Sequence, residues 1–235
     1  MENASAIICA FNEERTISGV ITSVAQSNLF QEIIVVNDGS TDKTKNTILE
    51  CKDSLDIIDI HLPINLGKGF AMATGIDRAS SKILVFCDAD LSDLKSEHLR
   101  QLLLPIFLNK ADMVLGQPTK DTTVDFVYNP LKSLTGERAL LKQDILPLIE
   151  KFKNSRFGVE TLINLYYKAQ NKRVIMIQLF GLKHYIKFEK ANQFQAIKQY
   201  LSEGHQIARA AVKNYPLLSK NIFNAFYKTL SYKSR

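Results

Sequence analysis

Tryptophan is absent from the 235-residue chain, and cysteine is scarce, with only Cys9, Cys51 and Cys87. Three cysteines cannot all pair with one another, so a small disulfide-stabilised domain is excluded, and reduced thiols in a cytoplasmic protein are expected. The composition is otherwise ordinary, with 46% hydrophobic and 23% charged residues, which excludes a long disordered region and a collagen-like repeat.

Long apolar runs are also missing. No stretch of about 18 apolar residues occurs, so no membrane-spanning helix is expected. The first five residues lack the basic and apolar segments of a secretory signal peptide. We therefore expect a cytoplasmic protein that forms one large domain or two small ones.

Basic charge is concentrated towards the end of the chain. The net charge is +6, and residues 192–235 contain seven basic residues and one acid, so residues 1–191 are neutral overall. This distribution disfavours a uniformly basic DNA-binding domain, and no nucleic acid partner is expected. A basic tail suits either attraction to an anionic membrane surface or a solvated helix face.

Short apolar runs alternate with helical patterns through the first half of the chain. The runs cover residues 6–11, 32–36, 57–62, 83–87 and 112–116. Continuous apolar strands, each followed by a helix, predict an α/β fold with a mainly parallel sheet that is covered by helices on both faces. Ligands of such sheets bind beyond the carboxyl ends of the strands, and polar clusters follow the first, second and fourth runs.

The second half follows a different pattern. Residues 117–130 are polar and irregular, which predicts a mobile functional loop. Helical patterns cover residues 137–153 and begin again at Glu160, and an apolar run at 174–177 predicts a strand that leads toward His184. From about residue 191 the pattern is that of amphipathic helices.

Two carboxylates, Asp88 and Asp90, follow the fourth apolar run. Extended backbone points both side chains the same way, and like charges so close are unfavourable unless a cation lies between them. Because hard cations prefer oxygen ligands, the pair favours Mg²⁺ or Mn²⁺ carrying a diphosphate. The alternative is a turn followed by an acidic helix cap.

Two further clusters suit a nucleotide. Asn-Asp-Gly-Ser at residues 37–40 offers Asp38 as an acceptor for a base or ribose, and Gly39 permits close backbone approach. The alternative for Asp38 is a helix-capping turn. Asn-Leu-Gly-Lys-Gly at residues 65–69 offers backbone amides and Lys68 to phosphate. The fingerprints of dinucleotide dehydrogenases and of Walker loops are absent.

Taken together, four motifs resemble family 2 glycosyltransferases of the GT-A fold. They are Ala-Phe-Asn-Glu-Glu at 10–14, the clusters at 37–40 and 65–69, and Asp-Ala-Asp at 88–90. The branches most similar in look are polyprenyl- or dolichyl-phosphate sugar transferases and glucosyl-3-phosphoglycerate synthases. The resemblance implies a GT-A domain over residues 1–190, with a nucleotide-binding half (1–116), an acceptor half (117–190) and a basic helical tail at 191–235.

The resemblance also implies roles in the nucleotide-binding half. Phe11 and Glu13 would line the nucleoside pocket, with Glu13 near the ribose. Asp38, beside Gly39, would hold the base, and Lys68 would lie near the nucleotide.

Metal-binding and acceptor-side roles follow in the same way. Asp88 would reach the ribose or a metal-bound water, Asp90 would ligate the metal, and a C-terminal histidine, His184, would complete the metal shell. Gly136 and Arg138 match a segment near the donor sugar and acceptor. Arg138 suits a bidentate contact with phosphate, or a surface ion pair. His184 is otherwise a structural or exposed histidine.

Two departures from the family pattern bear on the reaction. Without tryptophan the chain lacks the Gln-x-x-Arg-Trp motif of processive polysaccharide synthases, so a single transfer is expected. The Glu-Asp pair of many inverting members is reduced to Glu160 followed by Thr161. Glu160 is thus either the general base or a surface carboxylate near a helix start, and the stereochemistry stays open.

The predicted function is metal-dependent, non-processive transfer of a hexose from a UDP- or GDP-sugar to an acceptor hydroxyl or phosphate. The acceptor is a lipid phosphate, such as a polyprenyl phosphate, a cell-envelope glycan precursor or another small molecule. A tail on the inner face of the membrane would suit the lipid. The alternatives are a non-catalytic nucleotide-sugar-binding protein, a sugar nucleotidylyltransferase, and a membrane adaptor that acts through the tail.

Overall fold

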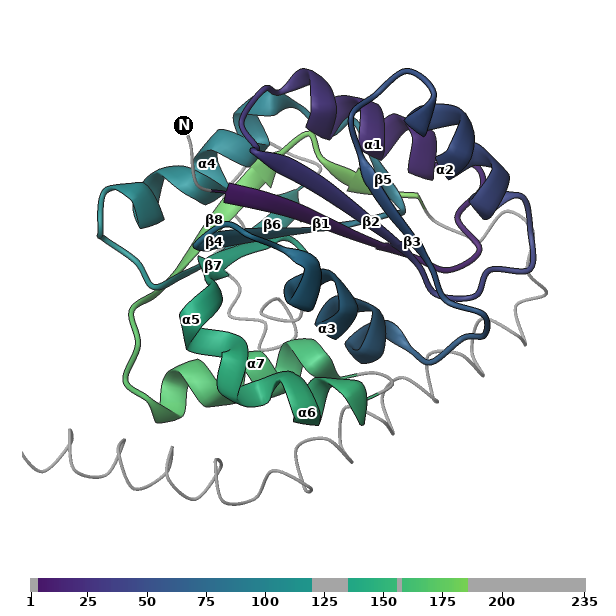
Figure 1. Ribbon diagram of the computed structural model, residues 1–235. Coiled ribbons are helices and arrows are strands. Elements are labelled where there is room, and N and C mark those ends of the chain that lie inside the picture. Colours follow the sequence, from purple (N-terminus) through teal and green to yellow (C-terminus); the bar gives the residue numbers. More distant parts are fainter. Residues whose placement is uncertain (1–3, 120–134, 156–157, 186–235) are drawn as a thin grey trace, which may run out of the picture.

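The computed structural model describes residues 4–119, 135–155 and 158–185. Its centre is a seven-stranded sheet with the order β3-β2-β1-β4-β7-β6-β8 (Figure 1). β7 runs antiparallel to β4 and β6, and the other neighbouring pairs of this sheet are parallel, which confirms the predicted mainly parallel sheet. The strands are β1 (Ala4–Ala10), β2 (Glu32–Asn37), β3 (Ile58–His61), β4 (Ile83–Asp88), β6 (Met113–Thr119), β7 (Arg138–Leu141) and β8 (Val174–Phe180).

The middle residues of the central strands are apolar at consecutive positions because both faces of the sheet are covered. In β1, Ile7 belongs to one apolar cluster, whereas Ala6 and Ile8 belong to the other. All three side chains are fully buried. Successive residues of a strand point to opposite faces, so a sheet with two covered faces needs apolar residues at every position.

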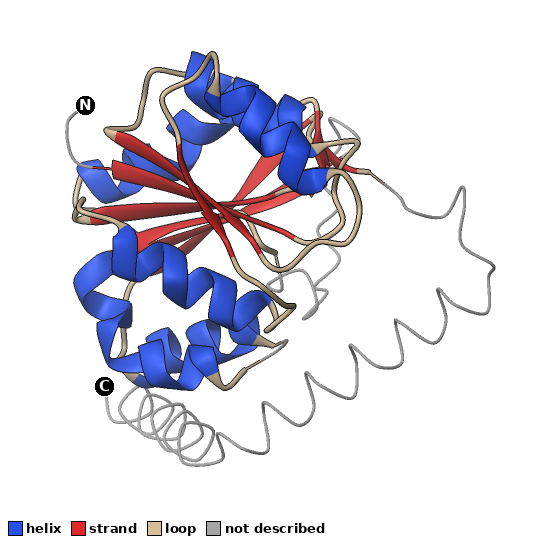
Figure 2. Ribbon diagram, turned by 45° about the vertical axis from the view of Figure 1, so that its right-hand side comes forward, coloured by secondary structure: helices blue, strands red, loops and turns tan. Residues whose placement is uncertain are grey.

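Helices form one layer on each side of the sheet (Figure 1, Figure 2). One face carries α1 (Ile17–Gln26), α2 (Thr44–Lys52) and α4 (Ser96–Phe107), and the other carries α3 (Lys68–Arg78), α6 (Ile149–Lys153) and α7 (Val159–Ala169). The start of α3 packs tightly on α6, since a Cβ on Gly69 would lie 2.0 Å from the carbonyl oxygen of Ser155. This glycine lets Lys68, one residue earlier, lie close to the second half of the chain.

Residues 137–153, predicted as one helix, form four elements instead. β7 comes first, followed by α5 (Lys142–Ile145), the 3-10 helix η2 (Leu146–Leu148) and α6. Ala139 and Leu140 are fully buried in β7, and the strand pairs with β4 and β6 on its two sides. The prediction was wrong because tertiary pairing outweighs local helix propensity, and Pro147 in η2 cannot continue a helix ladder.

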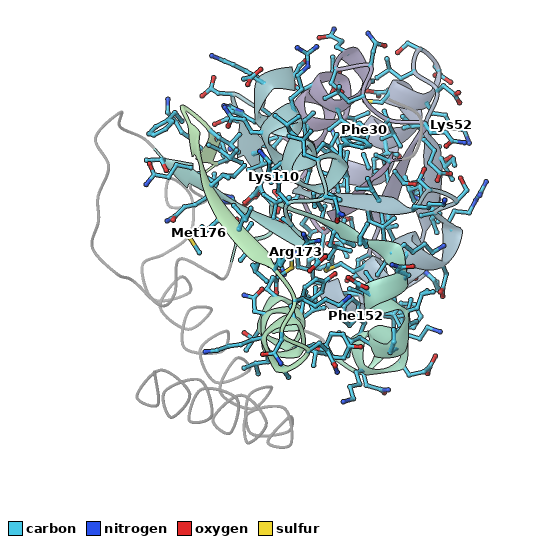
Figure 3. The ribbon with its side chains drawn as sticks, turned by 90° about the vertical axis from the view of Figure 1, so that its left-hand side faces the viewer. Phe30, Lys52, Lys110, Phe152, Arg173 and Met176 are labelled. Atoms are coloured by element: carbon cyan, nitrogen blue, oxygen red, sulfur yellow. The ribbon has the colours of Figure 1, made fainter. Side chains whose placement is uncertain are left out.

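β8 forms one edge of the sheet, where Met176 points outward (Figure 3). The chain then turns at Gly181, which has a φ of +82°. It continues into β9 (Lys183–His184), which pairs with β5 (Leu91–Ser92) in a separate two-stranded ribbon. The predicted strand leading toward His184 is therefore confirmed.

The tail at 191–235 lies outside the described residues. Of the segment 117–130, predicted as a mobile loop, residues 117–119 belong to β6 instead, and residues 120–130 lie outside the described residues. Within the described ranges, no helix combines the length and apolar character needed to cross a bilayer. All three cysteines are free thiols, as expected.

Candidate active site

The end of β4 and the β5–β9 ribbon bring the three predicted metal ligands together. Asp88 ends β4, Asp90 precedes β5, and His184 lies opposite Leu91 in the ribbon. One ligand atom from each of Asp88, Asp90 and His184 lies within 4.8 Å of the others. Two carboxylates and an imidazole so arranged fit a divalent cation such as Mg²⁺ or Mn²⁺.

His184 is positively charged in this arrangement. Its Nδ1 lies 3.1 Å from Asp90 Oδ1, and this hydrogen bond, together with the charges of Glu137 and Asp88, raises the pKa of His184 to about 9. The imidazolium therefore neutralises part of the acidic cluster. Because a ligating imidazole must be neutral, binding of a metal to His184 would release its proton.

Lys68 joins the predicted metal ligands to the second half of the chain. Its ammonium donates to Asp88 Oδ1 at 2.7 Å and lies 2.7 Å from Glu160 Oε1 in the first turn of α7. Burial opposes the charge of Lys68, but the two carboxylates outweigh burial and raise its pKa well above the usual value. The site thus contains an Asp88–Lys68–Glu160 ion triad.

A buried carboxylate without a predicted role lies beside His184. The Glu137 side chain is 1% exposed, and its Oε2 is 3.9 Å from His184 Nε2 and accepts a hydrogen bond from the Thr135 hydroxyl. Its Oε1 has no hydrogen-bond partner among the described residues. Burial raises the pKa of Glu137 to about 7. The local sequence does not reveal the burial of Glu137, because a glutamate next to an arginine is also typical of an exposed surface helix.

Arg138 is placed differently from the prediction. It is fully buried in β7, and its guanidinium donates to the backbone oxygen of Thr135 and, at 3.4 Å, to Asn164 Oδ1. Burial lowers the pKa of Arg138, while the carboxylates of the site favour its charged form. The alternative of a surface ion pair is wrong, since the Arg138 side chain is fully buried, and its bidentate contact with phosphate stays a prediction. Arg138 instead balances the acidic charge from within the sheet.

Gly136 forms part of the wall beside Asp88. Arg138 pairs with Phe86 in the antiparallel register of β4 and β7, which brings Gly136 level with Asp88. A Cβ on Gly136 would lie 2.1 Å from Asp88 Oδ2. A glycine here therefore permits the position of the carboxylate, and the contact of Gly136 with a donor sugar stays a prediction.

Asp38 and Gly39 hold the loop before α3. The two oxygens of the buried Asp38 carboxylate accept hydrogen bonds from the amides of Leu66 and Gly67, each at 2.8 Å. Gly39 has a φ of +66°, and a Cβ there would lie 2.2 Å from the carbonyl carbon of Ile64. The prediction that this loop offers its amides to phosphate is wrong for these two amides, which serve Asp38.

Phe11 and Glu13 lie in the loop after β1, which is hydrogen-bonded to the loop after β2 and to the first residue of α2. The Asn12 amide donates to Ser40 Oγ at 3.0 Å, and the Glu13 amide donates to Thr44 Oγ1 at 2.8 Å. Phe11 is 40% exposed beside these bonds. The cross-bonded loops form a fixed rim next to the carboxyl ends of β1 and β2, and the nucleoside contacts of Phe11 and Glu13 stay predictions.

A pocket at the carboxyl end of β4 is lined by several of these residues. Part of its lining is apolar, and its charged groups come from α3, β4, β7 and α7. Its lining residues are Ile7, Cys9, Lys68, Met72, Phe86, Cys87, Asp88, Gly136, Arg138 and Glu160. Burial raises the pKa of the Cys9 thiol to about 12, so this thiol stays protonated and is no nucleophile.

Comparison with protein families gives a match over most of the chain. The family described as Glycosyl transferase family 2 matches residues 5–201. Two curated poly-beta-1,6-N-acetyl-D-glucosamine synthases, from Staphylococcus epidermidis and Staphylococcus aureus (strain COL), are each 35% identical to it over 91 residues. The matched segment is 38% of this chain and 22% of each synthase, so it spans only about a fifth of the length of these relatives.

Solved structures share the fold over nearly the whole chain. Glucosyl-3-phosphoglycerate synthase from Mycobacterium tuberculosis, in complex with Mn²⁺, UDP and glucosyl-3-phosphoglycerate, aligns with a TM-score of 0.69 and 20% identity, covering 90% of this chain and 79% of that one. The same synthase with Mg²⁺ and UDP gives a TM-score of 0.68 and 20% identity, over 90% and 78% of the two chains. Both metals in these complexes are ones that the sequence predicts here.

Proposed function

Since the chain belongs to glycosyl transferase family 2 and has the GT-A fold, we propose that it transfers a single hexose from a UDP- or GDP-sugar to an acceptor hydroxyl or phosphate. The observation that carries this proposal is the convergence of Asp88, Asp90 and His184 at the carboxyl end of β4, with Lys68 beside them. These groups meet where open α/β sheets bind their ligands.

Asp88, Asp90 and His184 would hold Mg²⁺ or Mn²⁺ at this rim. When bound, such a metal supplies a positive charge that stabilises the diphosphate leaving group. Lys68 is the second cation of the site, and its ammonium is held between Asp88 and Glu160. It would orient the diphosphate and add to the charge stabilisation.

Glu160 is the proposed general base on the acceptor side. Its side chain is 15% exposed, its Oε1 lies 2.7 Å from the Lys68 ammonium, and its carboxylate would accept the proton of an acceptor hydroxyl. Phe11, Glu13 and Asp38 are proposed to bind the nucleoside at the rim formed by the loops after β1 and β2. Asp38 would contribute its carboxylate, which also accepts hydrogen bonds from the Leu66 and Gly67 amides.

Non-processive transfer is supported by the absence of tryptophan, and with it of the Gln-x-x-Arg-Trp motif. The acceptor is proposed to be a lipid phosphate, a cell-envelope glycan precursor or another small molecule. For a lipid acceptor, residues 191–235 would contribute contact with an anionic membrane through their basic residues.

The test replaces Asp90 by alanine and measures release of nucleoside diphosphate from a panel of UDP- and GDP-hexoses with Mn²⁺ and candidate acceptors. We expect Asp90→Ala to abolish turnover and retain the fold. The matched control is Asp93→Ala, because Asp93 is 54% exposed and pairs with Lys183 in the same region. Normal metal-dependent transfer by Asp90→Ala would refute the site.

The products of the same assay separate the alternatives. Release of pyrophosphate in place of nucleoside diphosphate would identify a nucleotidylyltransferase. Tight binding of a nucleotide sugar without turnover across the acceptor panel would identify a binding protein.

A further inference from the structure

Glu137 is a buried acid to which the proposed reaction gives no task. It precedes β7, its backbone oxygen accepts a hydrogen bond from the Gly116 amide at 2.8 Å, and its side chain is 1% exposed. One carboxylate oxygen has no partner in the part of the chain that the structure describes. A buried carboxylate so poorly satisfied is unfavourable for folding, which points to a function.

The imidazole of His184 lies between two carboxylates. Its Nδ1 is 3.1 Å from Asp90 Oδ1, and its Nε2 is 3.9 Å from Glu137 Oε2. Adjacent ligands of an octahedral Mg²⁺ or Mn²⁺ ion lie about 3 Å apart, which is the spacing on the Nδ1 side. The ring therefore presents Nδ1 to the proposed metal and turns Nε2 toward Glu137.

A metal-bound imidazole keeps one proton, on the nitrogen away from the metal, and that N–H is normally held by a carboxylate or carbonyl. We propose that Glu137 is a positioning residue. Its carboxylate would accept a hydrogen bond from the Nε2–H of His184 and so fix the tautomer in which Nδ1 faces the metal. This inference rests on the proposed function, because His184 is one of its metal ligands.

The geometry supports this positioning role of Glu137. The separation of 3.9 Å is that of an ion pair, and the imidazole, which is 40% exposed, would have to turn toward Glu137 for Nε2 to donate a hydrogen bond. The Thr135 hydroxyl, which lies against Glu137 Oε2 and the backbone oxygen of Gly116, anchors the carboxylate. Glu137 is thus fixed by the sheet, whereas His184 lies on a ribbon of two residues per strand.

The experiment measures Mn²⁺ binding directly, by the electron paramagnetic resonance signal of free Mn²⁺, with the full chain in the presence and absence of UDP. We expect Glu137→Gln to weaken Mn²⁺ binding by about 10- to 100-fold. Glu137→Asp keeps the charge but retracts the carboxylate by one methylene, and we expect it to weaken binding in the same direction. Melting in EDTA verifies that each variant is folded.

The matched control is Asp144→Asn. Asp144 is also a buried acid with one unpartnered oxygen among the described residues, and its other oxygen pairs with Lys172 at 2.9 Å. It follows β7 at the end of the sheet opposite to His184. Asp144→Asn therefore removes a buried carboxylate that is far from the proposed metal ligands. It should leave the Mn²⁺ affinity unchanged.

A double-mutant cycle with His184→Ala decides whether Glu137 acts through the imidazole. In the His184→Ala background, Glu137→Gln should change Mn²⁺ affinity by less than about twofold, because no imidazole remains to be oriented. An undiminished loss in that background would overturn the proposal and assign Glu137 a direct electrostatic effect. Unchanged affinity of both Glu137 variants would overturn the proposal alone. Failure of the wild type to bind Mn²⁺ would overturn the metal site together with it.

Discussion

Replacing Lys68 by methionine removes the cation that joins Asp88 to Glu160 and leaves the apolar part of the side chain in place. Both carboxylates lie 2.7 Å from the Lys68 ammonium, so they face one another across at most twice that distance. Their side chains are 21% and 15% exposed, and that of Lys68 is 30% exposed. Without the lysine, two partly buried acids repel each other and are poorly hydrated.

The stability lost on removing Lys68 lies between two limits. Removing one partner of a fully buried ion pair costs about 3–5 kcal/mol, and exposed pairs contribute about 0–1 kcal/mol. For groups exposed by 15–30%, we expect Lys68→Met to lower the free energy of unfolding by about 2–3 kcal/mol in EDTA. Added Mn²⁺ should recover part of this loss, since it binds the native state and neutralises Asp88.

Urea denaturation of Lys68→Met and of Lys153→Met provides the measurement and its matched control. Lys153 also lies between two acids, at 3.1 Å from Glu150 and 3.8 Å from Asp77, but these are 83% and 54% exposed. Its loss should lower the free energy of unfolding far less than the loss of Lys68 does. If the two variants lose the same stability, the Asp88–Lys68–Glu160 triad contributes no more than a surface pair, and the reasoning is refuted.

Two further predictions concern the metal ligands. Gly136→Ala should weaken Mn²⁺ binding by about 10-fold or more while the protein stays folded, because the added Cβ would lie 2.1 Å from Asp88 Oδ2. Titration of the variant with Mn²⁺ measures this loss. The control is Gly19→Ala, because nothing lies within 4 Å of a Cβ at Gly19. The pKa of His184 is raised from 6.5 to about 9 by Asp90, so its contribution to metal-free stability is complete below pH 6.5 and is lost as the pH rises through 9. Melting curves in EDTA should show this decline for the wild type, and an equal decline in His184→Gln would contradict it.

The sequence predicts those parts of the fold that depend on local pattern. The runs that form β1, β2 and β4 contain at least four consecutive apolar residues each, because both faces of each strand are buried, and this is visible without a structure. Asp88 and Asp90 are two residues apart after a strand, so their proximity also follows from local geometry. The position of His184 beside them was predicted only through the family resemblance, because nearly 100 residues separate it from Asp90.

Long-range pairing accounts for what the sequence does not reveal. The segment from Glu137 to Leu141 has the composition of a helix, and only the space between β4 and β6 makes most of it a strand. This error concealed both the burial of Arg138 and the position of Glu137. The partners of Asp38 are amides 28 and 29 residues further along the chain, which no local turn rule identifies.

The charges of the site explain how a cluster of acids is stable before a metal binds. Asp88 pairs with Lys68 and Asp90 pairs with His184, so each carboxylate already has a cation. Lys68 and His184 differ in how readily they can give up a proton to bind a metal. Lys68 lies at the start of a helix packed on the sheet and keeps its proton, whereas His184 can release its proton and become a ligand. We therefore infer that a metal would be held from the His184 side, where it would replace that proton and join the small β5–β9 ribbon to the end of β4, while Lys68 would stay available to the diphosphate.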